Sequence, residues 1–234
     1  ASLRITLVLD ALSFFLAFSL VALLPKKEEK TLGEKKLTFR VIFSDIKEGI
    51  HYIVKQKEIF FLLVMASSVN FFFAAFNYLL PFSNQLYGVQ GAYATILTMG
   101  AIGSIVGALL ASKIKASMEM LLFLLALTGL GVMIMGLTLP SYLTFSGNFV
   151  CELFMTIFNI HFFTQVQTKV EGEYLGRVLS SIYTLAILFM PIATGLMTWL
   201  PSVHLYSFLI IGLGVVALSF LALGYVRTRF EKET

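Results

Sequence analysis

Residues 58–81 read EIFFLLVMASSVNFFFAAFNYLLP. The run is apolar over almost its whole length, and it is long enough to cross a bilayer, which takes about 17–25 residues of helix. Further blocks of similar length and character lie at approximately 5–24, 91–112, 118–138, 142–166, 178–199 and 203–226. The sequence therefore predicts an all-α integral membrane protein with seven transmembrane helices.

The composition supports this class. Hydrophobic residues make up 58% of the chain and charged residues 13%, whereas soluble domains have about 45–50% and about 25%. The block at 5–24 is longer than the apolar core of a signal peptide and ends without a cleavage pattern, so we interpret it as a span. A single cysteine, Cys151, excludes an intrachain disulfide and a cysteine metal cluster. The chain has no phosphate-binding glycine loop with lysine, no HExxH and no GxSxG motif, so we predict no enzyme and no cofactor.

The lysines and arginines predict the orientation. If all seven blocks cross, every one of the 17 basic residues except Arg4 lies on the same side. By the positive-inside rule this side is cytoplasmic. The prediction is a multi-pass protein of the cell membrane, with residues 25–57 and the C-terminus in the cytoplasm. The net charge of +4 follows from this topology and does not indicate nucleic-acid binding.

Charge and hydropathy divide the chain into a first span, a basic cytoplasmic linker and a six-span domain, at 1–24, 25–57 and 58–234. In the linker, apolar residues recur at helical spacing between Phe39 and Val54 with charged residues between them. This pattern predicts a basic amphipathic helix at the membrane surface, whereas the polar stretch 26–38 fits a solvated tether. One span before the linker and six after it suggest that the chain is part of a larger protein.

Two of the predicted spans carry polar stripes. The quoted stretch has Asn70 and Asn77 seven positions apart, so the two amides share a helix face with Phe73 beside them. The span 142–166 has Met155 near a face of polar residues spaced three and four apart, namely Asn148, Glu152, Thr156 and Asn159. A charge at mid-bilayer costs at least about 2.5–3.5 kcal/mol, so each stripe is expected to face protein or a water-filled cavity.

Glu152 lies near the predicted midplane of its span. An ionisable residue at that depth is a functional hypothesis by default, and the role we predict is proton exchange. The alternative is structural: Glu152 stays protonated, or is hydrogen-bonded to Asn148, and only fixes packing. His161 follows nine positions later and points to nearly the opposite face, so it is not part of the predicted site.

The span 91–112 reads GAYATILTMGAIGSIVGALLAS and places Gly100, Gly103 and Gly107 close to one face. Small residues at this spacing let two helix backbones approach closely in a membrane. We therefore predict that this span is a packing helix, with close packing inside one domain favoured over a dynamic interface.

Five sequence features follow one another in a characteristic order: a span containing LDALSFF, the basic linker, a span ending NYLLPF, the glycine-rich GAIGSIVGALLAS, and QVQTKVEGEYLGRVLSSIYT followed by PIATG. Together they resemble the major facilitator superfamily, and most of all its macrolide-efflux and enterobactin-exporter-like branch of multidrug exporters. The first feature looks like helix six of that family and the last like its loop between helices ten and eleven. On this resemblance the chain corresponds to helix six, the central loop and the C-terminal six-helix half.

The resemblance implies a transporter whose two six-helix halves surround a central site. The implied partners are the lipid bilayer, a small-molecule substrate and the missing N-terminal half of the same transporter. Glu152 becomes the proton-coupling candidate, and the substrate-cavity candidates are Asn70, Phe73, Asn77, Asn148, Met155 and Asn159. Gly176 and Arg177 match the family's cytoplasmic GR pair, which makes them gating candidates, with Arg177 expected to pair with Glu171 or Glu173.

The resulting prediction is a secondary active efflux transporter, a proton-coupled antiporter of drugs or amphipathic metabolites. Two alternatives stay open. The chain is a non-transporting scaffold or accessory subunit, or it belongs to an importer or uniporter without proton coupling.

Overall fold

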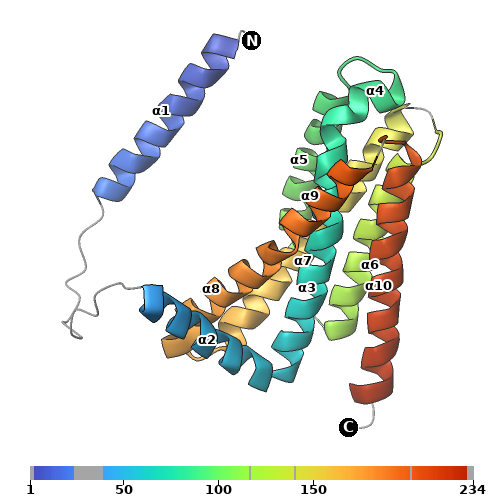
Figure 1. Cartoon of the computed structure of the whole chain (residues 1–234). Helices are drawn as coiled ribbons and strands as arrows, with labels where there is room; N and C mark the ends of the chain where they lie inside the picture. Colours follow the sequence, from blue (N-terminus) through green and yellow to red (C-terminus); the bar gives the residue numbers. More distant parts are fainter. Residues whose placement is uncertain (1–2, 24–38, 116, 140, 201, 231–234) are drawn as a thin grey trace. The chain divides into compact units, whose positions relative to one another are not determined.

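The structure is a computed structural model that describes residues 3–23, 39–115, 117–139, 141–200 and 202–230 (Figure 1). The predicted tether at 26–38 lies outside the described residues. Each regular element of the described part is a helix: α1 (Leu3–Ala22), α2 (Phe39–Lys55), α3 (Lys57–Leu79), η1 (Leu80–Phe82), α4 (Ser83–Tyr87), α5 (Ala92–Ala111), α6 (Met118–Met135), α7 (Ser141–Lys169), α8 (Gly172–Leu188), α9 (Met190–Trp199) and α10 (Tyr206–Phe230). The chain forms two compact units, Ala1–Val41 with α1, and Ile42–Thr234 with the helices from α3 onward and most of α2.

Helices long and apolar enough to cross a membrane dominate the second unit. The described residues contain six of them: Lys57–Tyr87, Ala92–Ala111, Met118–Met135, Ser141–Lys169, Gly172–Trp199 and Tyr206–Thr228. The all-helical fold is therefore that of a multi-pass membrane protein. The predicted span at 5–24 corresponds to α1, whose apolar part, Leu7–Ala22, is shorter than these six. A count of seven crossings stays a prediction.

Helix α6 packs against both α7 and α10, and pairs of glycines set both contacts. A Cβ atom placed on Gly131 would lie 2.7 Å from the carbonyl oxygen of Gly147 in α7. A Cβ atom on Gly129 would lie 2.8 Å from the carbonyl oxygen of Gly212 in α10. Real Cβ atoms do not come this close to backbone, so only glycine permits these approaches. The helices meet backbone to backbone, as expected where van der Waals packing drives association in lipid.

Tyr87 joins the helices at the α4 end of this unit. Its hydroxyl donates a hydrogen bond of 2.7 Å to the carbonyl oxygen of Met135, which belongs to the last turn of α6, where carbonyl groups lack helical partners. The ring of Tyr87 also lies 5.2 Å from that of Phe145 in α7 and 6.2 Å from that of Phe208 in α10. One side chain thus ties three helices together.

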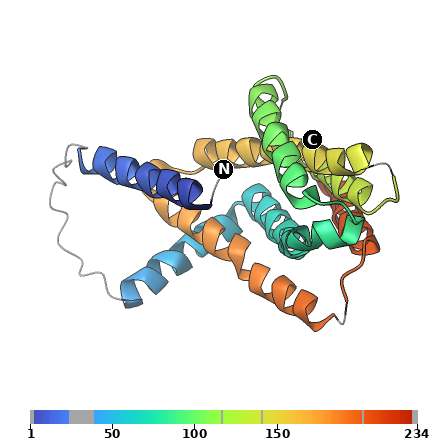
Figure 2. The same ribbon diagram turned by 90° about the horizontal axis from the view of Figure 1, so that it is seen from above.

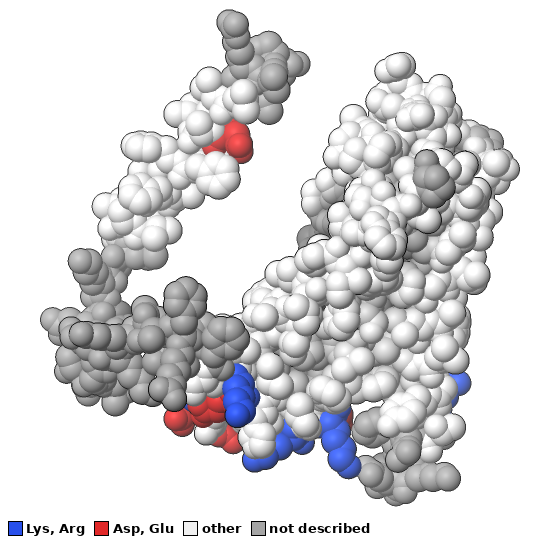
Figure 3. Space-filling model, in the orientation of Figure 1, with Lys and Arg blue, Asp and Glu red and all other residues white. Residues whose placement is uncertain are grey.

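The charged side chains of the second unit gather at the other end (Figure 3). Three ion pairs among the described residues link helices there: Glu48–Arg177 at 2.9 Å between α2 and α8, Glu58–Lys169 between α3 and α7, and Glu119–Arg227 at 3.5 Å between α6 and α10. Each pair is substantially exposed, so each stabilises the fold by only about 0–1 kcal/mol. Their common position defines a charged end of the bundle.

Candidate functional site

The contact between α5 and α7 is the closest helix approach around the predicted site. A Cβ atom on Gly103 would lie 2.3 Å from the carbonyl oxygen of Phe149, and one on Gly107 would lie 2.5 Å from that of Leu153. The glycines therefore press one face of α5 directly onto the α7 backbone, which is the packing role that their spacing predicted. The side chains of α7 that follow Phe149 are positioned by this contact.

Asn148 lies inside the contact. Its side chain packs over Gly100, where a Cβ atom would come within 2.4 Å of Nδ2, and the residue is only 3% exposed. Nδ2 donates a hydrogen bond of 2.8 Å to the carbonyl oxygen of Ile96 in α5. Oδ1 is buried and has no hydrogen-bond partner among the described residues. Asn148 thus links α7 to α5 by a buried hydrogen bond.

Glu152 follows one turn later on the same face and is partly buried. The hydroxyl of Ser104 in α5 donates a hydrogen bond of 3.2 Å to Oε2 of Glu152. The Cγ atom of Glu152 lies 3.1 Å from the place of a Cβ atom on Gly100. The missing side chain at this glycine therefore makes room for both polar groups.

Ser104 was not among the residues that the sequence singled out. The sequence did contain a signal for it. Ser104 lies four positions after Gly100 and three before Gly107, so it is on the edge of the helix face that the glycines form. In the described structure, the Ser104 hydroxyl is the one side-chain group of α5 that donates a hydrogen bond to Glu152 of α7.

Glu152 is electrostatically isolated along the chain. It is the only Asp, Glu, Lys or Arg within 59–112, 120–168 and 178–226. The neighbouring titratable group, Cys151, is fully buried and its backbone packs against Gly131 of α6. Within the apolar spans, therefore, no Lys or Arg side chain of the described residues neutralises the Glu152 carboxylate. The carboxyl group can lose its charge there only by binding a proton.

The remaining cavity candidates differ in burial, and no hydrogen bond among the described residues joins them to Glu152. Phe73 is buried, with its ring 5.8 Å from that of Phe76, so it is a core residue of α3. Asn70 is partly buried and Asn77 is exposed. On α7, Met155 is partly buried and Asn159 is exposed, although both lie near the face of Glu152. The two stripes share no hydrogen bond within the described residues.

His161 lies away from this group, as its position on the helix predicted. Its Nε2 atom is buried without a hydrogen-bond partner among the described residues. No contact joins it to Glu152 there, so it adds nothing to the candidate site.

The gating candidates lie at the start of α8. Gly176 is exposed, with open space where a Cβ atom would lie. The guanidinium of Arg177 pairs with Glu48 of α2 at 2.9 Å and lies 6.0 Å from the ring centre of Tyr174. The sequence suggested acids of the neighbouring loop, Glu171 or Glu173, whereas the partner that the structure shows comes from α2.

Helix α2 lies across α8 in both views of the bundle (Figure 1, Figure 2). The crossing point is Gly49, where a Cβ atom would lie 2.6 Å from the carbonyl oxygen of Arg177. Beside it, the Ser181 hydroxyl donates to the carbonyl oxygen of Arg177 at 2.8 Å and reaches that of Ile46 in α2 at 3.2 Å. The amphipathic helix is therefore held on α8 through its backbone.

Replacing Gly49 by alanine is expected to loosen α2, because the new methyl group meets a backbone carbonyl that cannot rotate away. Overpacking of this kind costs about 1–3 kcal/mol, which makes local opening of α2 at least about fivefold more frequent. Hydrogen–deuterium exchange of the α2 amides measures this opening. Gly176→Ala, on the neighbouring helix with open space around it, is the matched control and leaves the exchange unchanged. Equal exchange in the two variants would contradict the close crossing.

The fold and these contacts define a class: a multi-pass helical membrane protein in which Glu152 is the one Asp, Glu, Lys or Arg residue within 59–112, 120–168 and 178–226. The sequence matches the family model of the Major Facilitator Superfamily over residues 1–194. The chain belongs to this superfamily, whose members are transporters rather than enzymes. The matched region contains Asn70 through Arg177 and so covers both polar stripes and the gating candidates. No curated protein and no solved structure matches the chain significantly.

Proposed function

We propose that the protein is a secondary active efflux transporter that exchanges protons for drugs or amphipathic metabolites, and that Glu152 carries the proton. The charged end of the bundle faces the cytoplasm of the cell in this proposal, in agreement with the positive-inside rule. The resemblance to macrolide-efflux and enterobactin-exporter-like proteins supports the direction and the substrate class.

The observation that carries the proposal is the environment of Glu152. Its carboxyl group lies within an apolar span, without a basic partner among the described residues and with Ser104 as its hydrogen-bond donor. Because a charge is costly at this depth, binding and release of a proton change the energy of the site strongly. The bond to Ser104 also crosses from α7 to α5, so the protonation state acts on the contact between two helices. Proton exchange is thereby coupled to helix packing.

The exposed polar residues support a substrate cavity beside this acid. Asn77 on α3 and Asn159 on α7 are exposed polar side chains within two of the helices that are long and apolar enough to cross a membrane. An amide facing lipid is unfavourable, so we infer that these faces border a water-filled cavity closed by the N-terminal half of the transporter. Asn70 and Met155 lie beside them, and a carboxylate near such a surface favours a lipophilic cation.

A transport assay tests the proposal. The intact protein is reconstituted into liposomes with an acidic lumen, and uptake of ethidium, a permanent cation that a pH gradient alone does not trap, is followed by fluorescence. Protons leaving the lumen are expected to drive accumulation of ethidium above its external concentration, and nigericin, which collapses the gradient, abolishes the accumulation. Protein-free liposomes are the control. Accumulation that persists after nigericin would show that protons do not drive the transporter, and equilibration without accumulation would show a uniporter.

A further inference from the structure

The apolar face of α2 is wider than the contact that covers it. Ile53 is 1% exposed and lies on the side held against the bundle near Gly49, whereas Val54 is 50% exposed. Ile50, one turn before Val54, is partly buried. Part of the apolar stripe of α2 is therefore left open beside the polar face of the helix.

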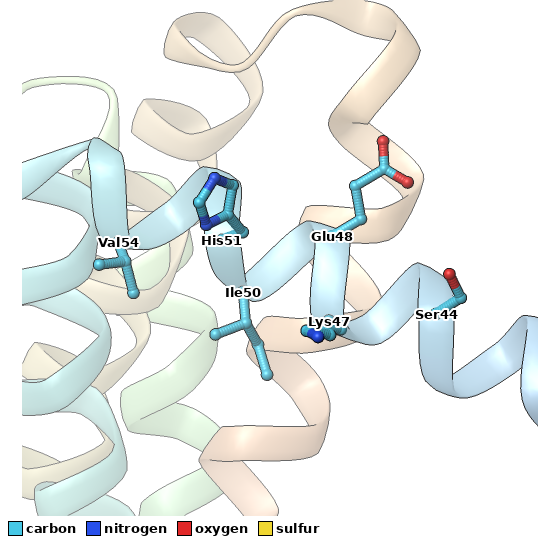
Figure 4. A pocket seen from close by; sticks show the side chains of 6 residues that line it. All are labelled: Ser44, Lys47, Glu48, Ile50, His51 and Val54. Atoms are coloured by element: carbon cyan, nitrogen blue, oxygen red, sulfur yellow. The ribbon is translucent and has the colours of Figure 1, made fainter.

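A groove of about 540 Å³ lies over this open part of α2 (Figure 4). Its lining residues among those described are Ser44, Lys47, Glu48, Ile50, His51 and Val54. In Figure 4 the side chains of Glu48 and His51 point to one edge of the helix and that of Ile50 to the opposite edge. The groove thus combines polar side chains on one side with an apolar side chain on the other.

Among the described residues that line the groove, Lys47 is the only lysine or arginine and Glu48 the only acidic side chain. Glu48 is engaged by Arg177 at 2.9 Å, so its charge is already paired. Lys47 is exposed and forms no ion pair with another described residue. Lys55 adds a further exposed ammonium at the end of the same helix. A ligand with a negative head and an apolar tail matches this arrangement.

We propose that the groove binds the headgroup of an anionic phospholipid of the inner leaflet. The phosphate accepts from the Lys47 ammonium and the Ser44 hydroxyl, with His51 beside them, and the glycerol and upper acyl chain lie on Ile50 and Val54. Basic segments at the inner face of a membrane attract such lipids by about 1 kcal/mol per lysine, and a partly buried amphipathic helix supplies the apolar contact. The site rests on the proposed orientation, with the charged end toward the cytoplasm, and does not depend on proton exchange at Glu152.

The lipid has a structural consequence for α2. The opposite side of this helix is fixed on α8 through Gly49, and the Glu48–Arg177 pair joins the edge of the groove to α8. A lipid bound on the outer side therefore holds α2 between the bilayer and α8, and stabilises the start of α8 in the position that the ion pair defines.

The test is lipid binding by the purified intact protein in detergent, measured by native mass spectrometry during titration with dioleoyl-phosphatidylglycerol. Lys47→Gln is expected to weaken binding about fivefold, as the loss of one ammonium near a lipid phosphate predicts. Dioleoyl-phosphatidylcholine, which carries no net charge, is expected to bind weakly to both proteins. The exposed Lys113 lies at the same charged end of the bundle, and Lys113→Gln is the matched control with less than a twofold effect. Circular dichroism verifies that the variants fold.

Two results would overturn the proposal. An equal loss in Lys47→Gln and Lys113→Gln would mean that the whole basic end attracts anionic lipid without a site on α2. Displacement of the lipid by inorganic phosphate at similar concentration, in the wild type but not in Lys47→Gln, would mean that the groove is an anion site for which the lipid tail is irrelevant.

Discussion

Replacing Gly103 by alanine is expected to lower the free energy of unfolding of the bundle by about 1–3 kcal/mol, the usual effect of overpacking a close contact. The added Cβ atom would lie 2.3 Å from the carbonyl oxygen of Phe149. That oxygen belongs to the backbone of α7, so it cannot rotate away as the amide of Asn148 can at Gly100. The helices must separate, and the hydrogen bonds of Asn148 and Glu152 to α5 are stretched as a result.

Gly224→Ala is the matched control. Gly224 lies in α10 with open space where a Cβ atom would be, and alanine is the better helix former by about 1 kcal/mol. The same substitution is therefore expected to lower stability in α5 and to leave it unchanged or raise it in α10. Cys151 is buried, so a thiol-reactive dye that fluoresces on reaction reports thermal unfolding of both variants. Equal midpoints for the two would contradict the close contact of α5 and α7.

The class of fold follows from the sequence because hydropathy is a local property. A run such as 58–81 can only be a span or a buried helix, and its length decides between them. The packing role of Gly103 and Gly107 is equally local, since their spacing puts them on one face. The structure shows that these glycines pack against α7. Their spacing alone does not predict which helix is the partner.

Exposure within one stripe was not predictable in the same way. Asn148 and Asn159 lie near the same face of α7, yet Asn148 is 3% exposed and Asn159 is exposed. Periodicity gives the direction of a side chain around its helix. It does not show how far along that helix a neighbour such as α5 continues, so a shared face did not mean a shared environment.

The sequence also could not predict ion pairs between residues that are far apart along the chain. Arg177 pairs with Glu48, which is 129 positions away, although Glu171 and Glu173 are its nearest acids in the sequence. Sequence proximity favours the nearby acids, whereas the crossing of α2 over α8 at Gly49 brings Glu48 into place. Such a pairing depends on tertiary structure that no single-helix pattern contains.

Glu152→Gln is expected to abolish proton-driven accumulation of ethidium, down to the level of protein-free liposomes. Glutamine has nearly the same shape and still accepts a hydrogen bond from Ser104, so the contact of α5 with α7 is preserved. It cannot bind or release a proton, however, so a pH gradient has nothing to act on at this position. Exchange of ethidium across the membrane without a gradient is expected to continue, and its measurement shows that the variant is folded and binds substrate.

Glu152→Asp separates the two roles of the residue. Aspartate keeps the carboxyl group but is one methylene shorter, so it loses the 3.2 Å hydrogen bond from Ser104, worth about 0.5–1.5 kcal/mol. If the residue carries the proton, Glu152→Asp retains measurable accumulation while Glu152→Gln retains none. If Glu152 instead only holds α7 against α5, Glu152→Gln accumulates more ethidium than Glu152→Asp. The reason is that glutamine preserves the hydrogen bond to Ser104 and aspartate breaks it. The comparison therefore distinguishes proton coupling from helix packing within one assay.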